Sequence, residues 1–150
     1  DVGCGMGDMV AFRPNTVGCD VNPHTVQWVR ERGLIAEVIL DGRLPFESAS
    51  FDSVILDNVL EHIEDPTQLL MEIQRVLRPG GRLVVGVPGT RGYASDPDHK
   101  VFYDHDGLRS RMRQAGFTER RSFFMPLPLV WLDTRISQFC LYGVFDRLDG

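Results

Sequence analysis

Residues 1–9 read DVGCGMGDM, with three glycines at two-residue spacing behind an acidic residue. A glycine turn of this kind follows the first strand of many parallel sheets and bares backbone for a ligand. Dinucleotides require the pattern GxGxxG, but its third glycine position is here Asp8, whose carboxylate would repel a pyrophosphate. The loop therefore favours a cationic ligand, while a tight strand-to-helix turn without any ligand stays open as the alternative.

Strand patterns recur along the chain after this loop. Four short, continuously apolar runs are typical of buried parallel strands. They lie at 15–20, 35–40, 51–57 and 82–87.

Helix signals lie between these runs. Asn22 and Pro23 predict a helix start and Gly33 its end, and a second helix is predicted from Asp65–Pro66 to the breaker at Pro79–Gly81. Short apolar strands that alternate with helices indicate an α/β fold with a doubly wound, mostly parallel sheet. Such sheets bind ligands at the carboxyl ends of their strands.

Composition limits the class of protein. The 150 residues suffice for one domain with a core, and no apolar run reaches transmembrane length. The net charge of −5 argues against binding to a nucleic-acid backbone, so we expect no nucleic-acid partner. Cys4, Cys19 and Cys140 form no paired motif, which favours a reducing, cytoplasmic setting and structural roles for the three thiols.

Four sequence blocks in this order, DVGCGMG, LPF…SFD, LEHIEDP and RVLRPGGRL, together resemble the class I S-adenosylmethionine-dependent methyltransferases, and among them the methyltransferase type 11 group. The resemblance covers residues 1–88. It implies a Rossmann-like methyltransferase fold, S-adenosylmethionine as the cofactor, and an enzyme that methylates a small or medium-sized metabolite. A nicotinamide-dependent oxidoreductase on a related sheet and a non-catalytic cofactor-binding member stay open as alternatives.

The resemblance assigns cofactor contacts to acids and glycines that follow the strands. Asp20 would hold the ribose, Asp41 with Gly42 would flank the adenine, and Asp57 with Asn58 would close the site. Acidic side chains suit a ligand that carries a sulfonium and an ammonium group. The loop around the methionine part would consist of Asp1, Gly3, Gly5 and Gly7.

The resemblance also divides the chain, which we expect to form a single methyltransferase domain over 1–150. Residues 1–88 would form the cofactor-binding half, and 89–150 would supply an acceptor loop, a helix and a C-terminal part that completes the sheet. A first strand and an N-terminal helix precede the glycine loop in the family, so we expect both to be largely missing here. The short interval between Gly7 and Asp20 predicts a short first helix.

His62 and His99 are the candidates for catalysis. Methyl transfer to a hydroxyl or amine benefits from a base within hydrogen-bond reach of the acceptor. His62 follows the strand 51–57 at the ligand-binding edge, where a structural role is the equal alternative. His99 lies in a loop without apolar periodicity, the kind of segment that supplies acceptor-binding residues.

No metal site is expected. His99, His105 and the nearby aspartates are poorly spaced for tetrahedral zinc, and His105 is expected in solvent near the start of a helix.

The tail 123–145 predicts a covering helix plus an edge strand, with an apolar acceptor pocket or an interface as the alternative. Its aromatic residues include Trp131, Phe139, Tyr142 and Phe145.

Overall fold

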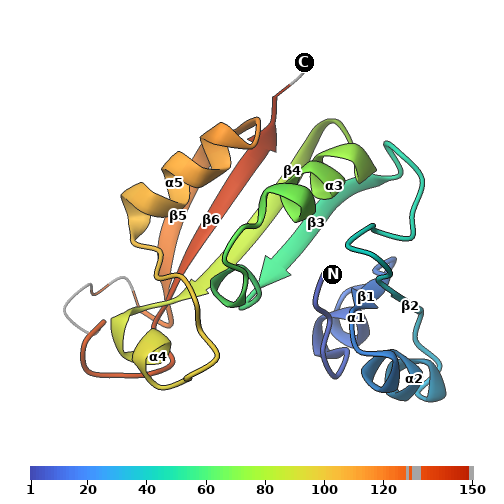
Figure 1. Cartoon of the computed structure of the whole chain (residues 1–150), viewed down its shortest axis with the longest axis horizontal. Helices are drawn as coiled ribbons and strands as arrows, with labels where there is room; N and C mark the ends of the chain where they lie inside the picture. The colour runs from blue at the N-terminus through green and yellow to red at the C-terminus, as the bar shows by residue number, and fades with distance from the viewer. Residues whose placement is uncertain (128, 130–132, 149–150) are drawn as a thin grey trace.

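The computed structural model describes residues 1–127, 129 and 133–148 (Figure 1). The helices are α1 (Asp8–Phe12), α2 (Pro23–Glu31), the 3-10 helix η1 (Leu60–His62), α3 (Thr67–Val76), α4 (Thr90–Ala94) and α5 (His105–Gln114). The strands are β1 (Gly18–Asp20), β2 (Ala36–Val38), β3 (Phe51–Asp57), β4 (Leu77–Pro88), β5 (Phe117–Met125) and β6 (Cys140–Arg147). None of the described helices has the length and apolar character needed to cross a membrane.

The strands form two hydrogen-bonded groups that the backbone around Val2 joins. β1 pairs with β2 in parallel, and the second group has the order β3–β4–β6–β5. Val2 forms parallel bridges to Cys19 in β1 and to Leu56 in β3, so the full order is β2–β1–Val2–β3–β4–β6–β5. Among the described strands β6 is the one whose direction is opposite to that of all the others, which confirms the predicted mostly parallel sheet.

Apolar side chains cover both faces of the sheet. The larger cluster joins α3 and α5 to Cys19, and the smaller one joins α1 and α2 to Ala36. Cys19 pairs with Glu37, the neighbour of Ala36, so Cys19 and Ala36 lie on opposite faces of the sheet. Figure 1 shows α3 and α5 over the strands β3 to β6, and the helices therefore lie on both sides, as a doubly wound fold requires.

The predicted helix signals are confirmed at α2. The side chain of Asn22 accepts a hydrogen bond from the His24 N–H at 3.0 Å, Pro23 is the first helical residue, and Gly33 follows the helix with a φ of 76°. The predicted short first helix is confirmed as well, since α1 has five residues.

α3 is shorter at both ends than the predicted helix. Asp65 lies before it and accepts a hydrogen bond from the Thr67 N–H at 3.1 Å. At the other end the chain leaves the helix before Pro79, because proline has no N–H and disfavours a helical conformation in the residue before it. Leu77 already belongs to β4 and pairs with Phe51.

β1 and β2 are also shorter than the apolar runs that predict them, with three residues each. Asn15 before β1 and Asp41 after β2 have positive φ angles of 57° and 51°. A residue in the left-handed region interrupts extended backbone, so regular extended structure does not continue through these two positions. Next to the strands, the Gly18 N–H still donates to the Ile35 carbonyl oxygen and the Ile39 N–H to the Asp20 carbonyl oxygen, at 2.9 Å each.

The described part of the tail contains strands instead of the predicted covering helix. β6 pairs with both β4 and β5 and therefore lies inside the sheet, while β5 forms the edge. Phe139 and Phe145 are buried. The local pattern does not distinguish helix from strand here, and pairing with distant β4 decides the outcome. Trp131 lies outside the described residues.

Arg75 of α3 fixes the loop between β2 and β3. Its guanidinium donates hydrogen bonds to the carbonyl oxygens of Phe46 (2.8 Å) and Leu44 (3.0 Å) and to both carboxylate oxygens of Glu72 (2.7 Å each). Glu72 in turn accepts a hydrogen bond from the Leu44 N–H at 2.9 Å. Because these groups are largely shielded from water, the bidentate pair and its carbonyl contacts hold the loop against α3.

We expect Arg75→Ala to lower the free energy of unfolding by about 2–3 kcal/mol, because several charge-assisted hydrogen bonds are lost together and Glu72 keeps its charge without its partner. Urea denaturation followed by circular dichroism measures this change. Arg78→Ala is the matched control, since Arg78 pairs with the exposed Asp52, and we expect it to cost less than about 1 kcal/mol. Equal losses in the two variants would contradict a stabilising role for the Arg75 contacts.

Candidate functional site

A cavity of about 360 Å³ lies at the carboxyl ends of β1, β2 and β3. Two wider hollows of about 540 and 650 Å³ lie beside the loop 40–48 and α3, but neither is lined by the glycine loop or by Asp20. The smaller cavity is therefore the candidate cofactor site. Its lining residues are Val2, Gly3, Asp20, Val21, Ile39, Gly42, Val59, His62, Ile63, Asp65, Gln68 and Leu69.

The three glycines of the loop have different structural surroundings. Gly3, Gly5 and Gly7 have φ angles of 72°, 49° and 82°, a region that side chains disfavour. A Cβ on Gly3 would lie 2.4 Å from Val59 Cγ2, and one on Gly7 would lie 2.9 Å from Val29 Cγ2. A Cβ on Gly5 would meet nothing within 4 Å. Gly3 and Gly7 are thus required by the fold itself, and the space beside Gly5 is free for a ligand.

Asp20 ends β1 with its carboxylate held in place by backbone. Its Oδ2 accepts a hydrogen bond from the Gly5 N–H at 3.0 Å, and its Oδ1 accepts one from the Asn22 N–H at 2.9 Å. A carboxylate has about four acceptor positions, so two remain for a ligand in the cavity. The contact with Gly5 ties the glycine loop to this acid, as the predicted shared role of the two requires.

The segment after β2 contributes Gly42 to the cavity, but not Asp41. Asp41 is exposed and lines the hollow of about 650 Å³. Its carbonyl oxygen accepts a hydrogen bond from Gln68 Nε2 at 3.1 Å, and its φ of 51° is unusual for a residue with a side chain. The predicted adenine contact of Asp41 is not among the groups that the structure brings into the cavity.

Asp57 ends β3 and turns toward the C-terminal strands. Its carboxylate accepts hydrogen bonds from Tyr142 Oη at 3.2 Å and from Asn58 Nδ2 at 3.4 Å. Burial raises the pKa of Asp57 above its ordinary value, although the Tyr142 bond works in the other direction. Asn58 follows with a φ of 51°. Neither side chain lines the cavity of about 360 Å³.

Asp1 lies away from the cavity. Its carbonyl oxygen accepts a hydrogen bond from the Cys19 N–H at 2.8 Å, and the residue lines a small hollow of about 110 Å³ together with Arg13 and Phe51. The structure therefore brings Gly3, Asp20, Gly42 and His62 of the predicted site together in the cavity wall. It leaves Asp1, Asp41, Asp57 and Asn58 outside that wall.

The cysteines do not have the character of nucleophiles. Burial raises the pKa of Cys19 to about 12, and it raises the pKa of Cys4 and Cys140 as well. A thiol is reactive as the thiolate, so all three are protonated at neutral pH.

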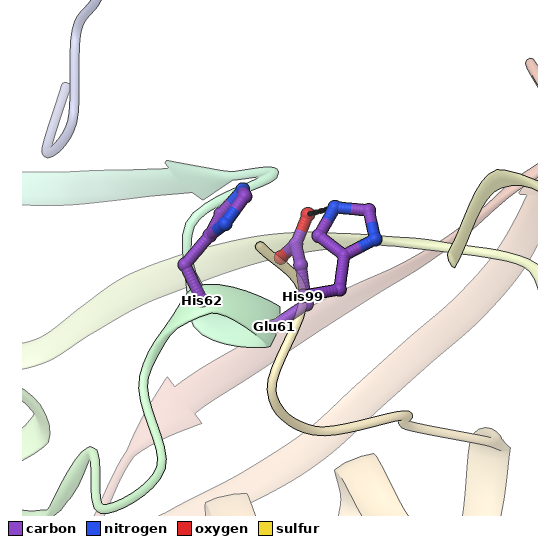
Figure 2. A group of neighbouring side chains, drawn as sticks. All are labelled: Glu61, His62 and His99. Atoms are coloured by element: carbon purple, nitrogen blue, oxygen red, sulfur yellow. Dashed lines mark ion pairs between the residues drawn. The ribbon is translucent and has the colours of Figure 1, made fainter. Parts of the chain in front are cut away.

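His62 and His99 lie next to each other although 36 residues separate them in the chain. Their ring centroids are 4.7 Å apart, with His62 at the end of η1 and His99 in the loop before α5 (Figure 2). His62 is exposed and lines the cavity, whereas the His99 side chain is 8% exposed. The two predicted catalytic histidines thus belong to one cluster, and His62 is the member that reaches the cavity.

Glu61 is the member of this cluster that the sequence did not reveal. Its residue is 1% exposed, and neither carboxylate oxygen has a hydrogen-bond partner among the described residues. Burial raises the pKa of Glu61, while His62 and His99 lower it by smaller amounts. A glutamate in a turn is ordinarily solvated, so only the position of η1 against the sheet shows that Glu61 points inward.

The family model described as "Methyltransferase domain" matches residues 1–85, more than half of the chain. The chain belongs to this methyltransferase family. The match contains the glycine loop, Asp20 and the Glu61–His62 turn, so the cavity lies within the part that defines the family. S-adenosylmethionine is the cofactor that the family implies.

Named relatives and solved structures agree with this assignment. The chain is 30% identical over 148 residues to "Probable tRNA methyltransferase 9B" of Homo sapiens, which covers 84% of this chain and 32% of that protein. It is 34% identical over 94 residues to "Ubiquinone biosynthesis O-methyltransferase" of Xanthomonas oryzae pv. oryzae, with 55% and 39% covered. The chain thus spans about one third of the length of these relatives.

Solved methyltransferase structures have the same fold as this chain. A "SAM-dependent methyltransferase, possible histamine N-methyltransferase" from Thermotoga maritima superposes with a TM-score of 0.78 at 20% identity, over 99% of this chain and 80% of that one. The likeness shows the Rossmann-like methyltransferase fold.

We expect Gly5→Ala to weaken the binding of S-adenosylmethionine at least about 10-fold, because the new methyl group enters the free space beside the loop. Calorimetric titration measures the affinity. Gly33→Ala is the matched control: Gly33 also has a positive φ, 76°, and open space at its Cβ position, but lies at the end of α2.

Both variants should lose about 1–2 kcal/mol of folding stability, the cost of a left-handed residue. Equal cofactor affinity of the two variants would show that no ligand approaches Gly5.

We expect Asp57→Asn to stabilise the protein more at pH 7 than near pH 4. Because the pKa of Asp57 is raised in the folded state, there is a pH range in which folded Asp57 is protonated and the same residue in the unfolded chain is ionised. The free energy of unfolding falls as pH rises through this range, and it stays lower at higher pH. Asparagine removes this titration and still accepts the Tyr142 hydrogen bond. Denaturation at both pH values measures the difference, with the exposed Asp52→Asn as control. A stability difference that does not change with pH would refute the assignment.

Proposed function

We propose that the protein transfers a methyl group from S-adenosylmethionine to a small or medium-sized metabolite. One observation carries the proposal: the family's glycine loop is hydrogen-bonded to Asp20 at the rim of an apolar cavity of about 360 Å³. A cavity of this size suits a cofactor-sized ligand.

The residues present fit the cofactor. Asp20 offers its two remaining acceptor positions to the ribose hydroxyls, and Gly5 allows close approach of the backbone. Val21, Ile39 and Leu69 form apolar walls against which a flat base can lie. When bound, S-adenosylmethionine supplies an electrophilic methyl group. The apolar lining excludes water around it, which favours transfer over side reactions.

We propose His62 as the residue that contacts the acceptor. It is exposed, lines the cavity, and lies at the carboxyl end of β3. A neutral imidazole there can accept a proton from a hydroxyl or amine acceptor. We infer that His99, which is buried behind it, acts through its neighbours and does not touch the acceptor.

Two observations favour a small acceptor over a nucleic acid. The net charge of −5 opposes a phosphate backbone, and the site is an apolar cavity without a basic side chain in its lining apart from histidine. Similarity to a protein named as a tRNA methyltransferase makes tRNA the other acceptor to test.

Asp8 argues against the oxidoreductase alternative. It is the first residue of α1, where a carboxylate would repel the pyrophosphate of a dinucleotide.

We also propose a cytoplasmic location, which the free thiols of Cys4, Cys19 and Cys140 support.

The acceptor class is tested with S-adenosylmethionine that carries a labelled methyl group. The full chain is incubated with it and either a deproteinised small-molecule extract or total tRNA. We expect label in the acid-soluble small molecules. Label in acid-precipitable, RNase-sensitive material would identify tRNA as the acceptor, and binding without any transfer would identify a non-catalytic member.

In calorimetric titrations of the full chain we expect Asp20→Ala to weaken cofactor binding by about 2–4 kcal/mol, because paired charge-assisted hydrogen bonds are lost. Asp52→Ala removes an exposed acid distant from the cavity lining and should bind like the unchanged protein. Unaltered calorimetric affinity of the Asp20 variant would remove this residue from the site.

A further inference from the structure

Glu61, His62 and His99 each direct one ligand atom into a common space. These three atoms lie within 4.8 Å of one another, and Figure 2 shows the Glu61 carboxylate and the two imidazole rings turned toward each other. They come from two segments, since Glu61 and His62 belong to η1 and His99 to the loop before α5. The loop is fixed there, because the Glu61 carbonyl oxygen accepts hydrogen bonds from the N–H groups of Lys100 (2.7 Å) and Val101 (3.0 Å).

The buried carboxylate of Glu61 has no hydrogen bond from the described residues to support its charge. Both of its oxygens are inaccessible and without a hydrogen bond in the described chain. Its Oε1 lies 3.8 Å from His99 Nε2, which is too long for a hydrogen bond. Burying an ionised carboxylate without a partner is strongly unfavourable, so the arrangement calls for a cation at this point.

His99 is oriented as a ligand to such a cation. Its Nδ1 lies 2.8 Å from the carbonyl oxygen of Tyr93, and because a carbonyl only accepts, Nδ1 carries the proton. Nε2 is therefore the ring atom left to act as a ligand, and it lies 3.8 Å from Glu61 Oε1 and 3.9 Å from Asp96 Oδ2. The Tyr93 ring stacks on the imidazole at 5.3 Å and keeps it in this orientation. An N–H donated to a backbone carbonyl is the usual outer contact of a histidine that binds metal.

We propose that Glu61, His62 and His99 bind one divalent transition-metal ion of the zinc class. Two imidazole nitrogens and one carboxylate oxygen are a donor set that such ions take in proteins, with one position left open. Ligands of a tetrahedral zinc ion lie about 3.3 Å apart for ordinary bond lengths. The 3.8 Å between Glu61 Oε1 and His99 Nε2, and the separations of up to 4.8 Å within the three ligand atoms, must shorten to that value when the ion binds.

This site differs from the metal site that the sequence led us to consider and set aside. That one combined His99 with His105 and nearby aspartates. The structure instead places His105 Nε2 3.0 Å from Glu119 Oε1 and 2.9 Å from Ser122 Oγ, on α5 and β5. Of the groups considered with His99, Asp96 does lie near it, with its Oδ2 3.9 Å from Nε2. The neighbours Glu61 and His62 come from η1, which no spacing of histidines in the sequence indicates.

The open coordination position of the ion lies near the candidate cofactor cavity. His62 is exposed and belongs to the cavity wall, so an ion bound to it is reachable from the cavity. An oxygen or nitrogen of the acceptor could complete its coordination, and this use of the ion rests on the proposed methyl transfer. With the ion bound, His62 would serve as its ligand and the ion, in place of a His62 base, would lower the pKa of the acceptor. Metal binding itself does not depend on the proposed transfer.

The test is the binding of Zn²⁺ to the full chain after removal of metal with a chelator. Calorimetry should show one strong site per chain, and Co²⁺ in its place should give the visible absorption bands of a low-symmetry site. Glu61→Gln, His62→Ala and His99→Ala should each weaken Zn²⁺ binding about 100-fold or more. His24→Ala, which removes an exposed histidine of α2, is the matched control and should leave the affinity unchanged.

The exposed His62 keeps the test decisive if a variant of a buried residue does not fold, because its removal leaves the core intact. Absence of a stoichiometric Zn²⁺ site, or a His62→Ala variant with unchanged affinity, would overturn the proposal and leave a buried Glu61–His99 ion pair. Binding of S-adenosylhomocysteine is measured on the same samples. A chain that binds Zn²⁺ but transfers no methyl group would refute the proposed function alone.

Discussion

Backbone hydrogen bonds at residues 1–3 hold the two groups of strands in one sheet. The Val2 N–H donates to the Ile55 carbonyl oxygen at 2.9 Å on one side, and on the other the Cys19 N–H donates to the Asp1 carbonyl oxygen at 2.8 Å. In the described chain this short segment is what lies between β1 and β3. Because it runs parallel to both, the ends of β1 and β3 meet at the same edge of the sheet. The glycine loop, Asp20 and η1 therefore surround one cavity, and every feature of the candidate site depends on this alignment.

Local sequence patterns predicted those parts of the protein whose contacts are local. The capping residue Asn22, the alternation of strands and helices, and the spacing of the loop glycines each depend on few neighbouring residues. Features that depend on distant pairing could not be predicted in this way. Tyr142 donates to Asp57 across 85 residues, and Glu61 is buried only because η1 packs against the sheet and the loop before α5. The same limit explains the tail, where the position of β6 beside β4 decides between helix and strand.

Several groups that follow β2 or lie at and after the end of β3 lower stability on their own. Asp41 and Asn58 have left-handed backbone, Asp57 is a partly buried acid, and Glu61 is a buried one. Such features persist where the surrounding structure fixes them, and they gather at sites that bind or react. Here the surroundings include the contacts of Arg75 with the loop between β2 and β3 and the apolar packing of α3. The segments that follow β2 and β3 are thus where the chain departs from what stability alone would favour.

The position of β6 also has a consequence for how the chain folds. β6 is the last described strand to leave the ribosome, yet it fills the gap between β4 and β5. Until it arrives, the facing edges of these two strands have no partner, and unpaired edges are the usual starting points of aggregation. Completion of the sheet must also bring together residues far apart in sequence, which slows folding. A newly made chain therefore passes through a state with an open slot in its sheet, and that state is where chaperones would be needed most.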